Sequence, residues 1–484
     1  MPTRRSLAFS FLDRYASLVI GIVSSMLIAR LLTPTEIGIF SVTMVLLAFV
    51  ATVRDMGAGQ YLIQEKNLTT ERIRAVWAVQ LGLGFALAII VLLASYPVAV
   101  FYEEPRMRDI MLVVALNYAV NPFGSLTYAW LMREMRFESI ALMRFTSTVA
   151  GAVVSAWLAW KGFGPISLAI GSLASTVVNA LLAVHFRPKA FPWLPGLSEI
   201  KRVLTFGSQM TASSIITVLS GSAPELLLGK LQDLTSVGLF SRASGLVHMF
   251  HRLFVDAVSA VCLPWFAKQS REQGGFADPF LKATSYVTAF GWAFCIGIVC
   301  LAQPVIRTLY GYQWDQSVDL ARLLAIAMAF SVPASLCATA LLSVGAVSTI
   351  TRTTVISALI SICFVAVGAS QGLLTLGALM IVSASINSAI WLRVASRTIG
   401  FSFNALFSSI WKSMAVACFA GIGPLIALLA YGAYPAERVE PLAVGVLVGL
   451  AGFLMGLRTF DHPLQEEVMT VWGKVTSSLA RAKR

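Results

Sequence analysis

The chain has 484 residues, of which 57% are hydrophobic and only 12% are charged, and its mean hydropathy is +0.80. This composition excludes an ordinary soluble globular protein, in which about a quarter of the residues are charged, and indicates a membrane protein. The formal net charge of +13 would suit a nucleic-acid partner if the cations were clustered. They lie between the apolar runs instead, so we expect no nucleic acid as a partner.

Apolar segments of about 20 residues, long enough to cross a bilayer, recur about 14 times. The first has the basic start of a secretory signal, but Asp13 and Arg14 interrupt it, so we expect it to be retained as a span. The sequence therefore predicts an all-α polytopic membrane protein with about 14 transmembrane helices. The expected spans are 15–32, 37–53, 76–99, 109–131, 145–161, 164–185, 205–228, 237–262, 283–303, 320–344, 353–370, 373–395, 412–432 and 442–460.

Lysine and arginine are unevenly divided between the connections of these spans. They are dense in the N-terminus, in alternate connections such as 54–74, 133–144 and 187–202, and in the tail from Arg458. Short loops rich in cations stay in the cytoplasm. We therefore expect both termini to be cytoplasmic, which agrees with an even number of spans.

One pattern occurs twice in the outer connections. Residues 29–41 read ARLLTPTEIGIFS, and residues 229–241 read GKLQDLTSVGLFS. Residues 101–122 and 309–333 also resemble each other, since each runs from an aromatic loop into a span that ends near a proline. We expect two parallel six-helix lobes around a central cavity, as in many transporters, although similar outer hairpins could also arise without a repeat.

The repeat predicts how the chain is divided. We expect an N-terminal six-helix lobe over 1–204, a C-terminal six-helix lobe over 205–400, and two additional helices with a cytoplasmic tail over 401–484.

The expected ends of the first two spans carry Arg14, Arg30, Arg54 and Asp55. Each residue alone is typical of topology anchoring. Together they favour a second interpretation, in which basic residues at the mouths of a cavity bind a diphosphate headgroup. Asp55 is then a candidate for coupling transport to an ion.

The seventh span is rich in serine and threonine and contains Pro224 followed by Glu225. The proline removes one helical hydrogen bond and allows a bend. Glu225 is a candidate proton or cation site that couples transport, and a hydrogen-bonded structural glutamate remains the alternative.

The eighth span carries charges at helical spacing. These residues form a stripe along one face of the expected helix. Because placing an arginine at the centre of a bilayer costs about 2.5–3.5 kcal/mol on insertion scales, the stripe should face protein or water. Arg252 and Asp256 are also spaced to pair across one helical turn. We expect a polar cavity wall that receives an anionic substrate, and a salt-bridged packing face or snorkelling side chains are the alternatives. The stripe consists of Arg242, Gly245, Met249, Arg252, Asp256 and Ser259.

Patterns typical of enzymes and metal sites are weak. The GxSxG match at 368–372 lies in a turn between two expected helices, without a preceding strand. His248 and His251 have no evident third ligand. We therefore expect no enzyme activity, no metal and no cofactor.

The stretch from Ala29 to Thr69 resembles the first hairpin of bacterial polysaccharide flippases in the multidrug/oligosaccharidyl-lipid/polysaccharide exporter superfamily. Two blocks carry the likeness: R-L-x-P-x-x-x-G, met loosely from Arg30 to Gly38, and D-x-G-x-x-x-x-L-I-Q, met from Asp55 to Gln64. It continues through FYEEPRMRDIMLVVAL, LMREMRFESIALMRF and VGLFSRASGL, as in exporters of the colanic-acid and O-antigen type. Two segments depart from the family pattern: Pro224, Glu225 and LLLGK in the seventh span, and FSRASGL in the eighth.

This resemblance implies a flippase of the bacterial inner membrane. Its substrate would be a polyprenyl-diphosphate-linked oligosaccharide, moved from the inner to the outer leaflet by alternating access. Membrane lipid and other proteins of polysaccharide assembly would be its partners. The alternatives are a cation- or proton-coupled drug exporter of the same superfamily and, less favoured because the outer connections are short, a membrane polysaccharide polymerase.

Overall fold

The computed structural model describes residues 19–54, 58–188, 191–273, 276–432, 440–467 and 469. Eleven helices in this part are long and apolar enough to cross a bilayer, and a bent helix pair raises the count to 12. The predicted all-α multi-pass membrane fold is therefore confirmed at this level. The backbone divides into two compact units, 1–238 and 239–484. Each is described by itself below.

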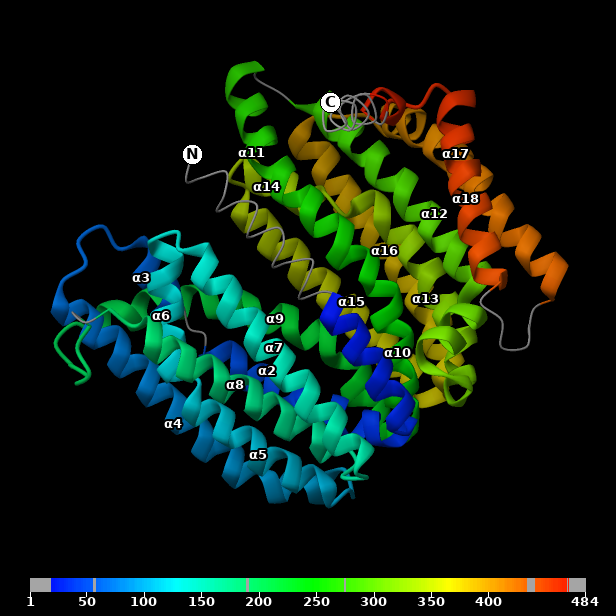
Figure 1. Ribbon diagram of the computed structural model, residues 1–484. Coiled ribbons are helices and arrows are strands. Elements are labelled where there is room, and N and C mark those ends of the chain that lie inside the picture. The colour runs from blue at the N-terminus through cyan, green and yellow to red at the C-terminus, as the bar shows by residue number, and fades with distance from the viewer. Residues whose placement is uncertain are drawn as a thin grey trace, which may run out of the picture. The chain divides into compact units, whose positions relative to one another are not determined.

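The first unit is a bundle of long helices joined by short turns (Figure 1). Among its neighbours, α4 packs along α5, α7 along α8, and α2 along α9. Its helices are Val19–Leu31, α2 (Pro34–Arg54), α3 (Ala58–Gln64), α4 (Thr70–Phe101), α5 (Arg106–Val120), α6 (Pro122–Arg133), α7 (Phe137–Trp160), α8 (Ile166–Phe186) and α9 (Ile200–Leu231).

A proline bends the fourth expected span. Helices α5 and α6 meet at Asn121 with an angle of 48°. Pro122 begins α6 and has no N–H to donate, so the regular hydrogen-bond pattern cannot pass this point. The bend packs against Gly84 of α4, where a Cβ would lie 2.8 Å from the Tyr118 carbonyl oxygen. Pro122 therefore accounts for the kink in this span.

The two repeated turns have matching helix starts. At the start of α2, Thr33 and Glu36 bond each other reciprocally. The Thr33 backbone N–H donates to Glu36 Oε2 at 2.8 Å, and the Glu36 backbone N–H donates to Thr33 Oγ1 at 3.3 Å. At α10 (Leu234–Phe250), Ser236 N donates to Asp233 Oδ1 at 2.6 Å. Both arrangements satisfy amides that a helix leaves unpaired at its first turn.

The same two turns also contact each other within the first unit. The hydroxyls of Thr35 and Thr235 are 2.8 Å apart. Gly38 lies against the backbone of Leu234, and Gly238 lies against the backbone of Pro34. Each glycine packs on the first residue of the other helix. The two halves of the contact are therefore equivalent, as if related by a local two-fold axis. The sequence repeats these residues because each copy forms half of one close backbone contact.

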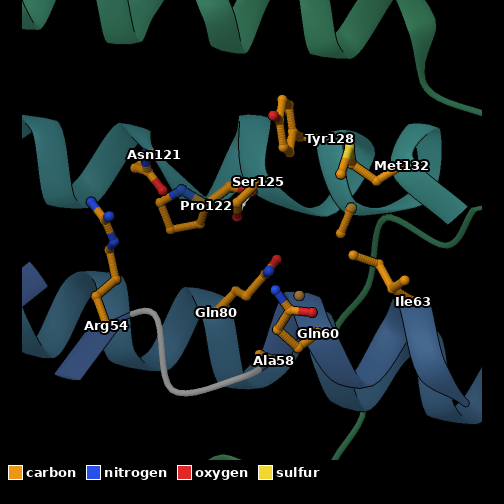
Figure 2. A pocket seen from close by; sticks show the side chains of 12 residues that line it. Arg54, Ala58, Gln60, Ile63, Gln80, Asn121, Pro122, Ser125, Tyr128 and Met132 are labelled. Atoms are coloured by element: carbon orange, nitrogen blue, oxygen red, sulfur yellow. Dashed lines mark hydrogen bonds between the residues drawn. The ribbon is translucent and has the colours of Figure 1, made fainter. Parts of the chain in front are cut away.

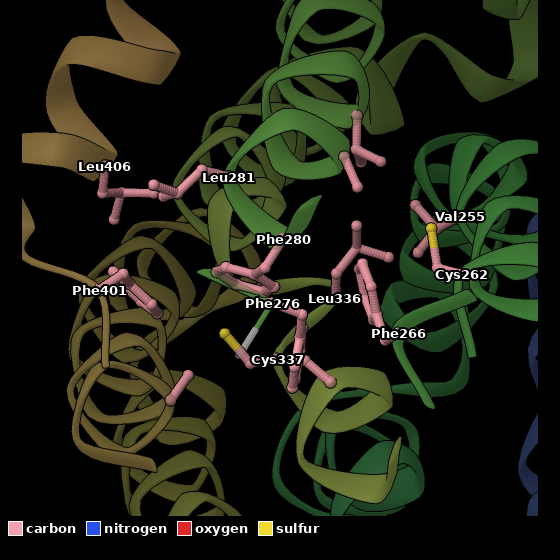
Figure 3. Close-up of a cluster of buried hydrophobic side chains, with 14 of the residues drawn as sticks. Val255, Cys262, Phe266, Phe276, Phe280, Leu281, Leu336, Cys337, Phe401 and Leu406 are labelled. Atoms are coloured by element: carbon pink, nitrogen blue, oxygen red, sulfur yellow. The ribbon is translucent and has the colours of Figure 1, made fainter. Parts of the chain in front are cut away.

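The second unit also consists of helices. Its core includes a cluster of aromatic and aliphatic side chains around Phe266, Phe280 and Leu336, shown in Figure 3. Helix α10 continues into it as the π-helical turn η1 (His251–Val255). The remaining elements are α11 (Asp256–Gln273), α12 (Ala277–Tyr310), η2 (Tyr312–Ser317), α13 (Val318–Ser331), η3 (Val332–Ala334), α14 (Cys337–Ser343), α15 (Val347–Gln371), α16 (Leu373–Ile399), α17 (Phe403–Tyr431) and α18 (Glu440–Thr459).

A buried histidine ties the segment after α18 to two other helices. His462 Nε2 lies 3.0 Å from the hydroxyls of both Ser285 on α12 and Ser413 on α17. The backbone N–H of Leu464 donates to His462 Nδ1 at 3.1 Å. The neutral imidazole therefore carries its proton on Nε2, which donates toward the serine hydroxyls. All three side chains are at most 1% exposed.

Candidate functional site

Two of the predicted site arginines lie at opposite ends of α2. Arg30 is exposed just before the helix begins, and Arg54 is its half-buried last residue. At 1.5 Å per residue, the 21 residues of α2 separate these ends by about 30 Å. A single diphosphate group therefore cannot contact both arginines at once. Arg14 and Asp55 lie outside the described residues.

Arg54 lines an open pocket bordered by α3, α4 and α6, with a volume of about 310 Å³ and several polar side chains among its apolar ones. Figure 2 shows Arg54 and Asn121 at one end of this pocket and Ile63 and Met132 at the other. We call it the N-terminal polar pocket. Its lining is completed by Ala58, Gly59, Gln60, Gln80, Pro122, Ser125, Tyr128 and Ala129.

Fixed contacts hold the wall that α3 contributes to this pocket. The Arg133 guanidinium at the end of α6 donates to the carbonyls of Leu62 at 2.8 Å and Ile63 at 3.3 Å, and it also contacts the Glu65 carbonyl at 2.6 Å. These carbonyls are among those that α3 leaves unpaired at its C-terminus. The Glu65 carboxylate in turn lies 3.2 Å from the guanidinium groups of Arg72 and Arg202. The short helix is thus anchored at its C-terminal end.

Glu225 is half-buried on α9, directly after Pro224. No hydrogen bond or ion pair joins its carboxylate to another described residue. The hydrogen-bonded structural glutamate that the sequence left open is therefore not seen among those residues. The candidate role in coupling stays a prediction.

In the second unit, Arg242 packs against two aromatic rings that also contact each other. Its guanidinium carbon is 5.6 Å from the ring centres of both Tyr310, the last residue of α12, and Trp314 in η2. Such a cation over aromatic faces is attracted electrostatically. This packing role was missed in the sequence, because the two aromatic partners are about 70 positions away along the chain.

The π-helical turn changes the predicted stripe on the eighth span. In a π turn each amide bonds to the carbonyl five residues back rather than four, and Asp256 N accordingly donates to His251 O. The Asp256 carboxylate lies 3.7 Å from His251 Nε2, while Arg252 Nη2 donates to the Gly245 carbonyl at 3.4 Å. The predicted pairing of Arg252 with Asp256 is therefore wrong. The extra residue in the turn also breaks the regular α-helical spacing between Arg242 and Asp256.

The predicted site residues thus fall into separate groups. The first unit holds Arg30, Arg54 and Glu225, and the second holds Arg242, Arg252 and Asp256, with Arg252 and Asp256 exposed. Sequence reasoning missed the neutral amides Gln60 and Gln80. The available signal was Gln80 itself, a glutamine inside the apolar run VWAVQLGLG. Among the described residues, no group of three or more His, Cys, Asp or Glu side chains is placed to hold a metal ion.

Comparison with known proteins decides the family. The profile of the family described as "Polysaccharide biosynthesis protein" matches residues 27–319, which is more than half of the chain. The chain belongs to this polysaccharide biosynthesis protein family. It is a membrane transport protein of polysaccharide biosynthesis and not an enzyme.

Individual relatives of this polysaccharide biosynthesis protein agree with that assignment. The chain is 23% identical to the succinoglycan biosynthesis transport protein ExoT of Rhizobium meliloti over 92% of its own length and 90% of the relative's. It is also 23% identical to the lipopolysaccharide biosynthesis protein WzxC of Escherichia coli, over 63% of each chain. The polysaccharide biosynthesis protein is therefore a transporter related to these proteins.

Solved structures agree on the fold of the polysaccharide biosynthesis protein. The lipid II flippase MurJ in an inward closed conformation superposes with a TM-score of 0.75 at 15% identity, covering 94% of this chain and 99% of that one. An inward-facing multidrug resistance transporter of the MATE family reaches 0.64 at 13% identity, covering 81% and 96%. At this identity the likeness establishes the fold alone.

Proposed function

We propose that this protein is a flippase. It moves a polyprenyl-diphosphate-linked oligosaccharide from the inner to the outer leaflet of the bacterial inner membrane, by alternating access, during the synthesis of a surface polysaccharide. The observation that carries the proposal is the family match together with the full-length similarity to a succinoglycan biosynthesis transport protein. The sequence resemblance to exporters of the colanic-acid type extends the proposal to that type, and the similarity to a lipopolysaccharide biosynthesis protein supports a surface polysaccharide as the product. Membrane lipid and other proteins of polysaccharide assembly would be its partners.

The proposed topology has 14 spans and both termini in the cytoplasm. The count of 14 adds two helices to the 12 candidate spans, namely the helix Val19–Leu31 and the 32-residue α9. An even number of spans agrees with the cation-rich connections at 54–74, 133–144 and 187–202 on one side. The proposed division into lobes over 1–204 and 205–400, with two further helices over 401–484, follows the sequence repeat.

We also propose how the charged residues act. Guanidinium groups bind phosphate oxygens bidentately, so Arg14, Arg30, Arg54, Arg242 and Arg252 are assigned to the diphosphate headgroup. Because α2 separates Arg30 from Arg54 by about 30 Å, these two would contact the headgroup at different stages of its passage. Glu225, Asp256 and Asp55 are the proposed groups that couple the return step to an ion.

Deletion of the gene is expected to trap lipid-linked sugars on the cytoplasmic face of the inner membrane. The test extracts polyprenyl-diphosphate-linked sugars and determines their leaflet with a membrane-impermeant probe. Restoring the intact gene should restore the outward distribution and the surface polymer. A normal distribution in the deletion strain would contradict the flippase proposal. Drug sensitivity with unchanged polymer would instead favour the drug exporter, which the likeness to a MATE transporter keeps as a second candidate.

Arg252→Ala is expected to lower polymer export about tenfold at normal membrane abundance. Arg252→Lys should recover only part of this loss, because an ammonium group cannot bind phosphate bidentately. Export is measured as surface polymer per unit of membrane-inserted protein. Arg393→Ala on α16, which removes another exposed arginine of the second unit, is the matched control and should export normally. Unchanged export by Arg252→Ala would remove Arg252 from the proposed headgroup site.

A further inference from the structure

The N-terminal polar pocket contains a buried amide that lacks a partner. Gln80 on α4 is 8% exposed, and its carbonyl oxygen Oε1 accepts no hydrogen bond from any described residue. Figure 2 shows the side chains of Gln60 and Gln80 reaching into the same space below Ser125. Leaving such an oxygen without a donor is unfavourable. A ligand with hydroxyl groups would supply the missing donor.

The chemistry of the lining favours a neutral, hydroxyl-rich ligand. The amides of Gln60, Gln80 and Asn121 can each donate and accept hydrogen bonds, as a sugar hydroxyl also does. The Ser125 hydroxyl donates to the Pro122 carbonyl at 3.2 Å, which leaves its lone pairs available to a donor. Among the lining residues Arg54 alone carries a charge, so the other polar groups of the lining are neutral.

The size and polarity of the pocket narrow the ligand further. A volume of about 310 Å³ lies at the lower end of the range of small-ligand pockets, roughly 300–1,000 Å³, so it suits one ring rather than a chain of rings. The Ile63 and Met132 side chains form an apolar end opposite Arg54. A pyranose has this combination, because its edge carries hydroxyls while its C–H face is apolar.

We propose that the N-terminal polar pocket binds a single pyranose ring, with Gln60, Gln80 and Ser125 bonding its hydroxyls and Arg54 contacting an anionic substituent such as a carboxylate or phosphate. This inference rests on the proposed function and deepens it, because the ring would belong to the glycan of the lipid-linked substrate. A soluble sugar nucleotide presents the same ring and is the other source of this chemistry.

The experiment measures sugar binding to the purified full-length protein in nanodiscs. Saturation-transfer NMR titrations use glucose, galactose, N-acetylglucosamine and glucuronic acid as probes. At least one probe should bind, and Gln80→Leu should weaken its binding at least about tenfold. Gln303→Leu is the matched control, because Gln303 on α12 is a fully buried glutamine whose amide likewise has no partner among the described residues. The Gln303→Leu variant should bind the sugar probe as tightly as the unsubstituted protein does.

Stability separates a binding role from a structural one. Because the Gln80 carbonyl oxygen has no partner to lose, the melting temperature of ligand-free Gln80→Leu should be unchanged or higher. Binding by no probe, or equal binding by Gln80→Leu, would overturn the proposal and leave a pocket that holds water alone. A Gln80→Leu variant that melts well below the unsubstituted protein would also overturn it, since the amide would then be structural.

Competition identifies the source of the ring. Lipid-linked oligosaccharide extracted from the deletion strain should displace the bound probe. Displacement by a sugar nucleotide alone would support the pyranose pocket and overturn its place in the substrate path. The leaflet assay keeps the two proposals apart: if the deletion strain traps lipid-linked sugars while no probe binds, the flippase stands and the pocket proposal fails.

Discussion

Gly38→Ala is expected to destabilise the first unit by about 3 kcal/mol, one of the two largest effects that we predict. A Cβ at Gly38 would overlap the carbonyl group of Leu234, and its distance to the Leu234 carbonyl carbon would be 2.7 Å. Added volume in a packed site costs about 1–3 kcal/mol, and the upper end applies here because a backbone carbonyl cannot rotate aside. The melting temperature of the purified protein and its abundance in the membrane measure the effect.

The local two-fold relation provides a second variant. Gly238→Ala should behave like Gly38→Ala, because its Cβ would lie 2.8 Å from the Pro34 carbonyl carbon and would overlap the attached oxygen. The matched control is Gly82→Ala on α4, where a Cβ would meet nothing within 4 Å. That change should leave the melting temperature unchanged or raise it, because alanine favours a helix over glycine by about 1 kcal/mol. Equal melting of all three variants would contradict the close contact.

His462→Ala is expected to destabilise the second unit by about 3 kcal/mol. It removes the acceptor of the Leu464 N–H and the group that bonds Ser285 and Ser413, all of them buried. A buried polar group left without its partner costs about 1–3 kcal/mol. Thermal unfolding measures the change, with His185→Ala as the control, since His185 is exposed at the end of α8. Equal destabilisation by the control would contradict the assigned role of His462.

The same histidine should make stability depend on pH. Burial and the nearby Lys412 ammonium lower the pKa of His462 from 6.5 to about 4. Between these values the unfolded chain binds a proton that the folded protein does not, so folding is favoured more strongly as pH rises. The contribution is fully present above pH 6.5 and is lost as pH falls toward about 4. The variant His462→Ala should lack this component, and an identical pH profile in both proteins would contradict it.

The parts of the fold that depend on local pattern could be predicted. Apolar runs of span length and the placement of cations gave the all-α membrane class, because the bilayer requires helices whose backbone groups bond internally. The bend at Pro122 and the 3₁₀ turn at Pro333 were also predictable, since a proline lacks the N–H that the helix needs. The effect still depends on the surrounding helix, because α9 continues through Pro224 and α17 continues through Pro424.

The candidate site was less predictable. The stripe from Arg242 to Ser259 assumed an uninterrupted α-helix, and the π turn at His251–Val255 broke its register. Periodicity cannot reveal a single π turn, because it is decided by packing against other helices. The N-terminal polar pocket was missed for a similar reason: Gln60, Gln80 and Ser125 come from three helices and form no motif in the sequence.

The repeated turn separates what the sequence determined from what the tertiary structure determined. The sequence by itself determined the two helix starts, because Thr33 with Glu36, and Asp233 with Ser236, satisfy backbone amides only three residues away. It also determined the spacing of 200 positions that relates Thr35 to Thr235 and Gly38 to Gly238. Only the tertiary structure decided that these turns touch. A close approach of two backbones depends on where whole helices pack, and glycine permits that approach without specifying its partner.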